Sequence, residues 1–98
     1  MSVEDEVRTV VYDALKALNE EQPADGQIVI ADGTALFGGD SMVDSLALVS
    51  VVIDVETAVS TQFDKMIALT DDRAMSRQPS PFDTVGNLIG YVVELVEE

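Results

Sequence analysis

The stretch LFGGDSMVDSLALVS, residues 36–50, contains two serines that each follow an aspartate and precede an apolar residue. Ser41 stands in Asp-Ser-Met and Ser45 in Asp-Ser-Leu. A serine at the start of a helix often only caps it, because its side-chain oxygen accepts a free backbone N–H. The same position also suits a covalent phosphate ester, since the free N–H groups and the helix dipole stabilise negative charge. Both serines are therefore candidates for covalent modification. The helix pattern that follows each one indicates which of the two is functional.

Few other residues could form a reactive site. The sequence has no Cys and no His, which excludes disulfides, thiolate chemistry, most transition-metal sites and the usual nucleophile–base pairs. The region from Asp32 is rich in acids and glycines, but Leu36 and Phe37 occupy the fifth and sixth positions, where a calcium loop needs an oxygen ligand and Gly. The remaining carboxylates are typical of a solvated surface. We therefore expect no catalytic site and no metal site.

The charge of the chain is strongly negative. It carries 19 acidic and 5 basic residues, a net charge of −14, and 47% of its residues are hydrophobic. Charge of this sign repels nucleic acid and anionic membrane surfaces and favours basic protein partners. The first residues, MSVEDEVR, lack the layout of a signal peptide, and no apolar run approaches the roughly 18 residues of a membrane span. We expect a cytoplasmic monomer that neither binds nucleic acid nor inserts into membranes.

Apolar residues at helical spacing predict three long helices, over residues 3–19, 45–62 and 84–97. Ser2 and Asp5 fit a capping box for the first, and Thr70 fits the cap of a shorter helix over 71–76. This order predicts one domain, residues 1–98, with an all-α four-helix fold of three long helices and one short one. The expected inward-facing residues are Val3, Val7, Val10, Val11, Ala14, Leu15 and Leu18 in the first helix, and Val85, Leu88, Ile89, Val92 and Val96 in the last.

A long segment, residues 20–44, separates the first two long helices and carries four of the six glycines. A connection of this length in a compact domain is uncommon and is often functional. Its apolar patches, at residues 28–30 and 36–37, are expected to pin it to the body of the protein. In the last helix, Gly86 and Gly90 either weaken the helix or permit close contact with another helix.

The pattern that follows each serine favours Ser45 as the functional one. A helix that opens at Ser45 has Val49, Val52 and Val55 four, seven and ten residues further on. A helix that opens at Ser41 has Ser45 four residues further on, where a buried aliphatic side chain belongs. Burying a hydroxyl without a good partner costs about 1–3 kcal/mol. Ser41 stays as the alternative.

Residues 44–46, Asp-Ser-Leu, resemble the signature of the acyl carrier protein family at the start of its second helix. Residues 36–38, Leu-Phe-Gly, resemble the Leu-Gly element that precedes this signature, although residues 37–42 also resemble it with Ser41 as the serine. SPFDTVGNLIGYV, residues 80–92, is similar to the beginning of the family's last helix. The resemblance covers essentially the whole chain and implies the four-helix carrier fold.

The resemblance also implies a function and its partners. Ser45 would carry 4'-phosphopantetheine from coenzyme A, with Asp44 and Leu46 framing it for a phosphopantetheinyl transferase. The thiol of that arm would hold acyl intermediates as thioesters for acyl-loading and acyl-transfer or condensing enzymes of fatty acid, polyketide or specialised lipid biosynthesis. The chain would then be a carrier and not an enzyme. A carrier of aminoacyl or peptidyl groups and an unmodified acidic interaction module are the alternatives.

The predicted second helix departs from the family at the positions that meet partner enzymes. The family usually shows acids soon after the serine, whereas here the first acids are Asp54 and Glu56. Recognition is therefore expected to be more apolar, and one side of the helix should face the core while the other is exposed. One side carries Leu46, Val49 and Ile53, and the other carries Leu48, Val51 and Val55. The candidate interface residues are Leu46, Leu48, Val49, Val51, Asp54 and Glu56.

Overall fold

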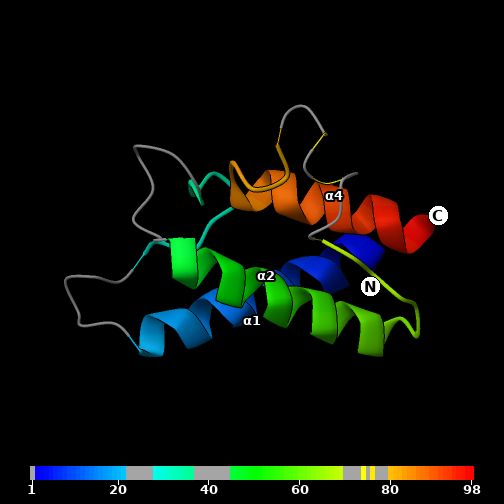
Figure 1. Cartoon of the computed structure of the whole chain (residues 1–98), viewed down its shortest axis with the longest axis horizontal. Helices are drawn as coiled ribbons and strands as arrows, with labels where there is room; N and C mark the ends of the chain where they lie inside the picture. Colours follow the sequence, from blue (N-terminus) through cyan, green and yellow to red (C-terminus); the bar gives the residue numbers. More distant parts are fainter. Residues whose placement is uncertain (1, 22–27, 37–44, 70–73, 75, 77–79) are drawn as a thin grey trace.

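The computed structural model of the chain describes residues 2–21, 28–36, 45–69, 74, 76 and 80–98. These residues form three helices, α1 (Val3–Glu20), α2 (Ser45–Gln62) and α4 (Val85–Glu97) (Figure 1). The described residues contain no strand, and a single β-bridge joins Ala35 to Thr84. The predicted all-α class and its three long helices are confirmed. The short helix expected over 71–76 lies mostly outside the described residues, of which Ala74 and Ser76 have helical backbone.

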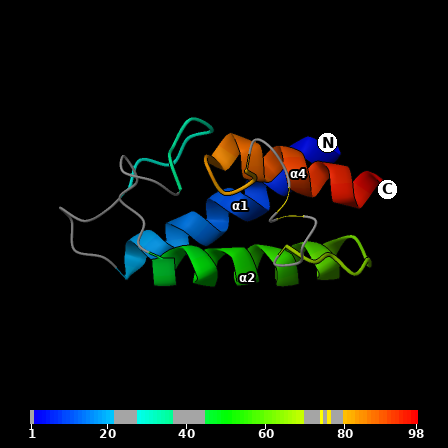
Figure 2. The same ribbon diagram turned by 45° about the horizontal axis from the view of Figure 1, so that its top comes forward.

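Helix α1 is the central element and packs against both α2 and α4. Figures 1 and 2 show α2 and α4 running in the same direction and α1 running the opposite way, so the start of α1 lies near the end of α4. The core is aliphatic and draws on every helix and on two connecting segments. Its buried residues include Val7, Val11, Leu15, Ile28, Leu36, Leu48, Val51, Val52, Val55, Val59, Ile67, Leu69, Val85, Leu88, Ile89, Tyr91 and Val92.

Helix α1 forms where its cap and its apolar stripe predict it. The Ser2 side chain accepts a hydrogen bond from the Asp5 N–H at 3.1 Å, which confirms Ser2 as the N-cap. Val7, Val11 and Leu15 recur every four residues and are fully buried. The other expected inward-facing residues, Val3, Val10, Ala14 and Leu18, are half-buried against this core.

The backbone of residues 32–34 accepts hydrogen bonds from the first N–H groups of α4. The first N–H groups of a helix have no partner within the helix. Here the Val85 N–H donates to the Thr34 carbonyl at 2.9 Å, and the Gly86 N–H donates to the Asp32 carbonyl at 2.7 Å. Thr84 caps the helix through a 3.1 Å bond from the Asn87 N–H. Residues 32–36 and α4 are thus joined backbone to backbone.

This contact explains Gly86 and separates it from Gly90. A Cβ on Gly86 would lie 3.0 Å from the Asp32 carbonyl oxygen, whereas a Cβ on Gly90 would meet nothing within 4 Å. Gly86 does permit a close contact, but its neighbour is the loop and not another helix. Gly90 makes no close contact, so its expected role in close helix packing is not seen. Its remaining expected effect is to weaken the helix.

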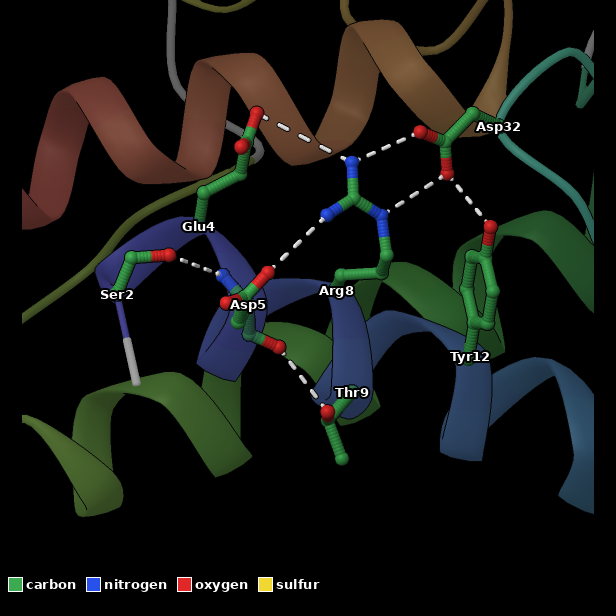
Figure 3. Close-up of polar contacts among 7 residues, drawn as sticks. All are labelled: Ser2, Glu4, Asp5, Arg8, Thr9, Tyr12 and Asp32. Carbon is green, nitrogen blue, oxygen red and sulfur yellow. Dashed lines mark hydrogen bonds and ion pairs between the residues drawn. The ribbon is translucent and has the colours of Figure 1, made fainter.

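Asp32 also ties the loop to α1 (Figure 3). Its carboxylate accepts hydrogen bonds from Arg8 Nε at 3.2 Å, from Arg8 Nη2 at 2.8 Å and from Tyr12 Oη at 2.6 Å. The bonds from Arg8 and Tyr12 lower the pKa of Asp32, and the same contact with Asp32 raises the pKa of Tyr12. Glu4 and Asp5 lie 4.0 and 3.7 Å from the guanidinium nitrogens of Arg8 and add to its negative surroundings.

Apolar and amide contacts fix the same loop at its two ends. The side-chain amide of Asn19 accepts the Ile28 N–H at 2.9 Å and donates to the Ile28 carbonyl at 3.0 Å. Ile28 and Leu36 are buried and Ile30 is half-buried, while Val29 is exposed. The expectation that apolar residues attach this segment to the body of the protein is therefore confirmed for Ile28, Ile30 and Leu36. Phe37 lies outside the described residues.

Helix α2 ends in a left-handed turn that leads into a segment turning back along the helix. Asp64 has φ 50°, and the Lys65 N–H donates to the Ser60 carbonyl at 3.1 Å, which is the Schellman arrangement. The Lys65 ammonium then donates to the Val96 carbonyl at 3.0 Å and also to the Glu98 carbonyl. Lys65 therefore joins the end of α2 to the end of α4, where cations are favoured.

Candidate functional site

Helix α2 begins at Ser45, and its bounds match the predicted range of 45–62. Its first turn contains no acidic residue, whereas the first turn of α1 contains Glu4, Asp5 and Glu6. Free N–H groups at a helix start attract negative charge. In a chain of net charge −14, this start has no acid of its own helix to repel an anion. Ser41 and Asp44 lie outside the described residues. The expectation of a buried side chain four residues after the functional serine is wrong for Ser45, because Val49 is 52% exposed. The choice of Ser45 therefore rests on the buried Val52 and Val55, seven and ten residues further on, and on the start of α2 at Ser45.

The two sides of α2 differ in exposure as predicted. Leu46, Val49 and Ile53 are 84%, 52% and 52% exposed. The opposite side is buried, with Leu48, Val51, Val52, Val55 and Val59 all in the core. The exposed three residues, called here the apolar row, extend from the residue after Ser45 over two further helical turns. Of the apolar interface candidates, Leu46 and Val49 lie at the surface, while Leu48 and Val51 pack inside.

The two acidic interface candidates have different surroundings. Asp54 is exposed and faces α1, where it lines a shallow groove. Glu56 is half-buried, and its carboxylate accepts the Leu69 N–H at 3.2 Å. Asp54 is therefore free to meet a partner, whereas Glu56 already holds a segment of its own chain.

The groove lies between α1 and α2, beside the apolar row. Its walls combine small and aliphatic side chains with the carboxylates of Glu21 and Asp54. The lining residues are Ala14, Ala17, Leu18, Glu21, Ser50, Val51 and Asp54.

Two features around this site were not predicted from the sequence. One is the link from Asp32 to Arg8 and Tyr12, which joins residues distant in sequence and leaves no local pattern. The other is the segment after α2, in which exposed Met66 and Ala68 alternate with buried Ile67 and Leu69. That alternation has the period of an extended chain with one face buried. The sequence does not reveal it, because residues 66–69 are all apolar (Met-Ile-Ala-Leu).

The part of the chain that the structure describes contains no group of three or more metal-ligating side chains that could hold a metal ion. Among the same residues, no helix is both long and apolar enough to cross a membrane.

No family model, no curated protein and no solved structure matches this chain.

Proposed function

We propose that this protein is a carrier of acyl groups, with 4'-phosphopantetheine from coenzyme A esterified to Ser45. The observation that carries the proposal is that α2 begins at Ser45 and presents an exposed apolar row directly after it. A transferase that modifies Ser45 would contact Leu46, which is 84% exposed. The chain itself acts as a cytoplasmic carrier and performs no catalysis.

The charge around the start of α2 fits such a group. A phosphodiester at Ser45 would lie at the positive end of the helix dipole, at the first turn of α2. No acid in the first turn of α2 opposes it. When bound, the group supplies a thiol on a long arm, and this thiol holds the acyl cargo as a thioester. The residues of the chain fix the attachment point and stabilise the phosphodiester charge.

The apolar row gives partner enzymes a surface to bury. Most of the energy of an interface comes from a few desolvated apolar or aromatic anchors, whereas exposed charges mainly steer the encounter. Leu46, Val49 and Ile53 suit the first role, and the net charge of −14 suits the second. We therefore infer that the transferase and the acyl-loading, acyl-transfer or condensing enzymes bring an apolar contact with basic residues around it.

The same surface also supports a second candidate function. An unmodified acidic module would bind basic partners through the apolar row without any covalent group. The exposure of Leu46, Val49 and Ile53 favours both functions equally, so the modification of a serine separates them.

Intact-mass measurement tests the proposal directly. After incubation with coenzyme A and a broad-specificity phosphopantetheinyl transferase, the chain should gain the mass of one phosphopantetheine group. Ser45→Ala should gain nothing, and Ser41→Ala should be modified as the parent chain is. Modification of Ser45→Ala but not of Ser41→Ala would move the site to Ser41, and no gain in any of the three proteins would favour the unmodified module.

A further inference from the structure

The segment after α2, residues 66–69, is called here the strap. Its exposure alternates, with Met66 95% exposed, Ala68 exposed, and Ile67 and Leu69 buried. Ile67 and Leu69 belong to the core cluster that also contains the buried side of α2. The strap therefore has the pattern of an extended chain that lies with one face on the core.

Two side chains of α2 hold the backbone of the strap. The Ile67 N–H donates to Ser60 Oγ at 3.1 Å, and the Leu69 N–H donates to Glu56 Oε2 at 3.2 Å. Two residues of extended chain advance about 6.6 Å, and four residues of helix advance about 6 Å. Ser60 and Glu56 thus match the spacing of Ile67 and Leu69, and the strap runs antiparallel along α2, as Figures 1 and 2 show.

The bonds that hold the described residues of the strap differ in kind along its length. At its start, Lys65 is fixed by a backbone bond to Ser60 and by its side-chain bonds to the end of α4. Further along, the Leu69 N–H depends on a side-chain acceptor, and a half-buried glutamate can leave it by changing rotamer. The left-handed residue Asp64 lies just before the strap, at the turn where its direction reverses.

We propose that the strap opens from α2 as a local unit and that Glu56 is the latch that holds it closed. Opening breaks the bond between Glu56 and the Leu69 N–H and brings Ile67 and Leu69 away from the core, while α1 and α4 stay folded. Such local openings occur below the free energy of global unfolding. Glu56 lies one turn after Ile53 of the apolar row, so the latch can be reached from the exposed side of α2. This inference is independent of the proposed carrier function.

Amide hydrogen exchange on the full chain tests the latch with a matched pair of variants. Glu56→Ala and Asp54→Ala each remove one carboxylate from α2 and each introduce the same residue, but only Glu56 contacts the strap. Loss of a hydrogen bond to a charged acceptor should speed exchange of the Leu69 amide about tenfold in Glu56→Ala relative to Asp54→Ala. The buried amides of Val11 and Val92 should exchange equally in both variants.

Two results would overturn the proposal. Equal Leu69 exchange in Glu56→Ala and Asp54→Ala would show that Glu56 is not a latch. A similar acceleration at Leu69, Val11 and Val92 would show that opening is global. Glu56→Gln keeps an oxygen acceptor at the same position and should restore most of the protection of Leu69. Equal loss of protection in the Gln and Ala variants would contradict a hydrogen-bonded latch.

Discussion

The two glycines of α4 offer a test of how firmly the loop before Ser45 is fixed. Gly86 is the second residue of α4, and its N–H donates to the Asp32 carbonyl at 2.7 Å. A Cβ on Gly86 would lie 3.0 Å from that oxygen and 3.6 Å from the Asp32 Cβ. The loop cannot yield freely, because the Asp32 carboxylate is held by Arg8 and Tyr12. Gly90 is exposed, with no atom within 4 Å of an added Cβ.

The free energies of unfolding of Gly86→Ala and Gly90→Ala should therefore change in opposite directions. Alanine is better than glycine in a helix interior by about 1 kcal/mol, and Gly90→Ala should realise most of that gain. Gly86→Ala gains at most the same amount, but overpacking a tight contact costs about 1–3 kcal/mol. We expect Gly86→Ala to be destabilised by up to about 2 kcal/mol. The two variants should then differ by about 1–3 kcal/mol.

Thermal and urea unfolding followed by circular dichroism would measure this difference. In a domain of this size, 1 kcal/mol shifts the Tm by about 4–8 °C, so Gly90→Ala should melt several degrees above the parent chain. An unchanged urea m-value in both variants would confirm that the unfolded states are comparable. Equal stabilisation of Gly86→Ala and Gly90→Ala would refute the close packing of α4 on the Asp32 loop.

Four further predictions concern docking, salt, and stability at acid and at alkaline pH. Replacing the apolar row with Ala should impair transfer by a cognate enzyme more than Asp54→Asn does at physiological salt, because desolvated anchors outweigh screened charges; a greater loss in Asp54→Asn would make docking electrostatic. The Tm near neutral pH should rise between about 0.01 and 0.1 M salt, as the Debye length falls from about 30 to about 10 Å and screens the net charge of −14; an unchanged Tm would show that self-repulsion is negligible. The parent chain should be more stable than Asp32→Asn, and this difference in the free energy of unfolding should be complete above the ordinary aspartate pKa of about 4. The difference should be lost as the pH falls through the lowered pKa of folded Asp32. Acid titrations of both proteins would measure it, and a difference that stays constant with pH would contradict the role of this carboxylate. At the alkaline end, the raised pKa of Tyr12 gives a contribution that is complete below about pH 10 and is lost as the pH rises further.

Local patterns in the sequence determined the helices of this protein. The apolar spacing predicted α1, α2 and α4 to within about one residue of their bounds, and Ser2 was predicted as the cap of α1. Such signals are local, since a helix forms from bonds between residues four apart and from a stripe with a period of 3.6 residues. The start of α2 at Ser45, on which the candidate site rests, was predictable for the same reason.

The sequence could divide the apolar residues of α2 into two sides but could not tell which one a neighbouring helix would cover. Only the packing against α1 decided that Leu48 and Val51 are buried while Leu46 and Val49 are exposed. Tertiary structure also gave Glu56 its bond to the Leu69 N–H and Gly86 its contact with Asp32. These contacts join segments 13 or more residues apart, and their partners are chosen by the packed chain rather than by any spacing within a helix.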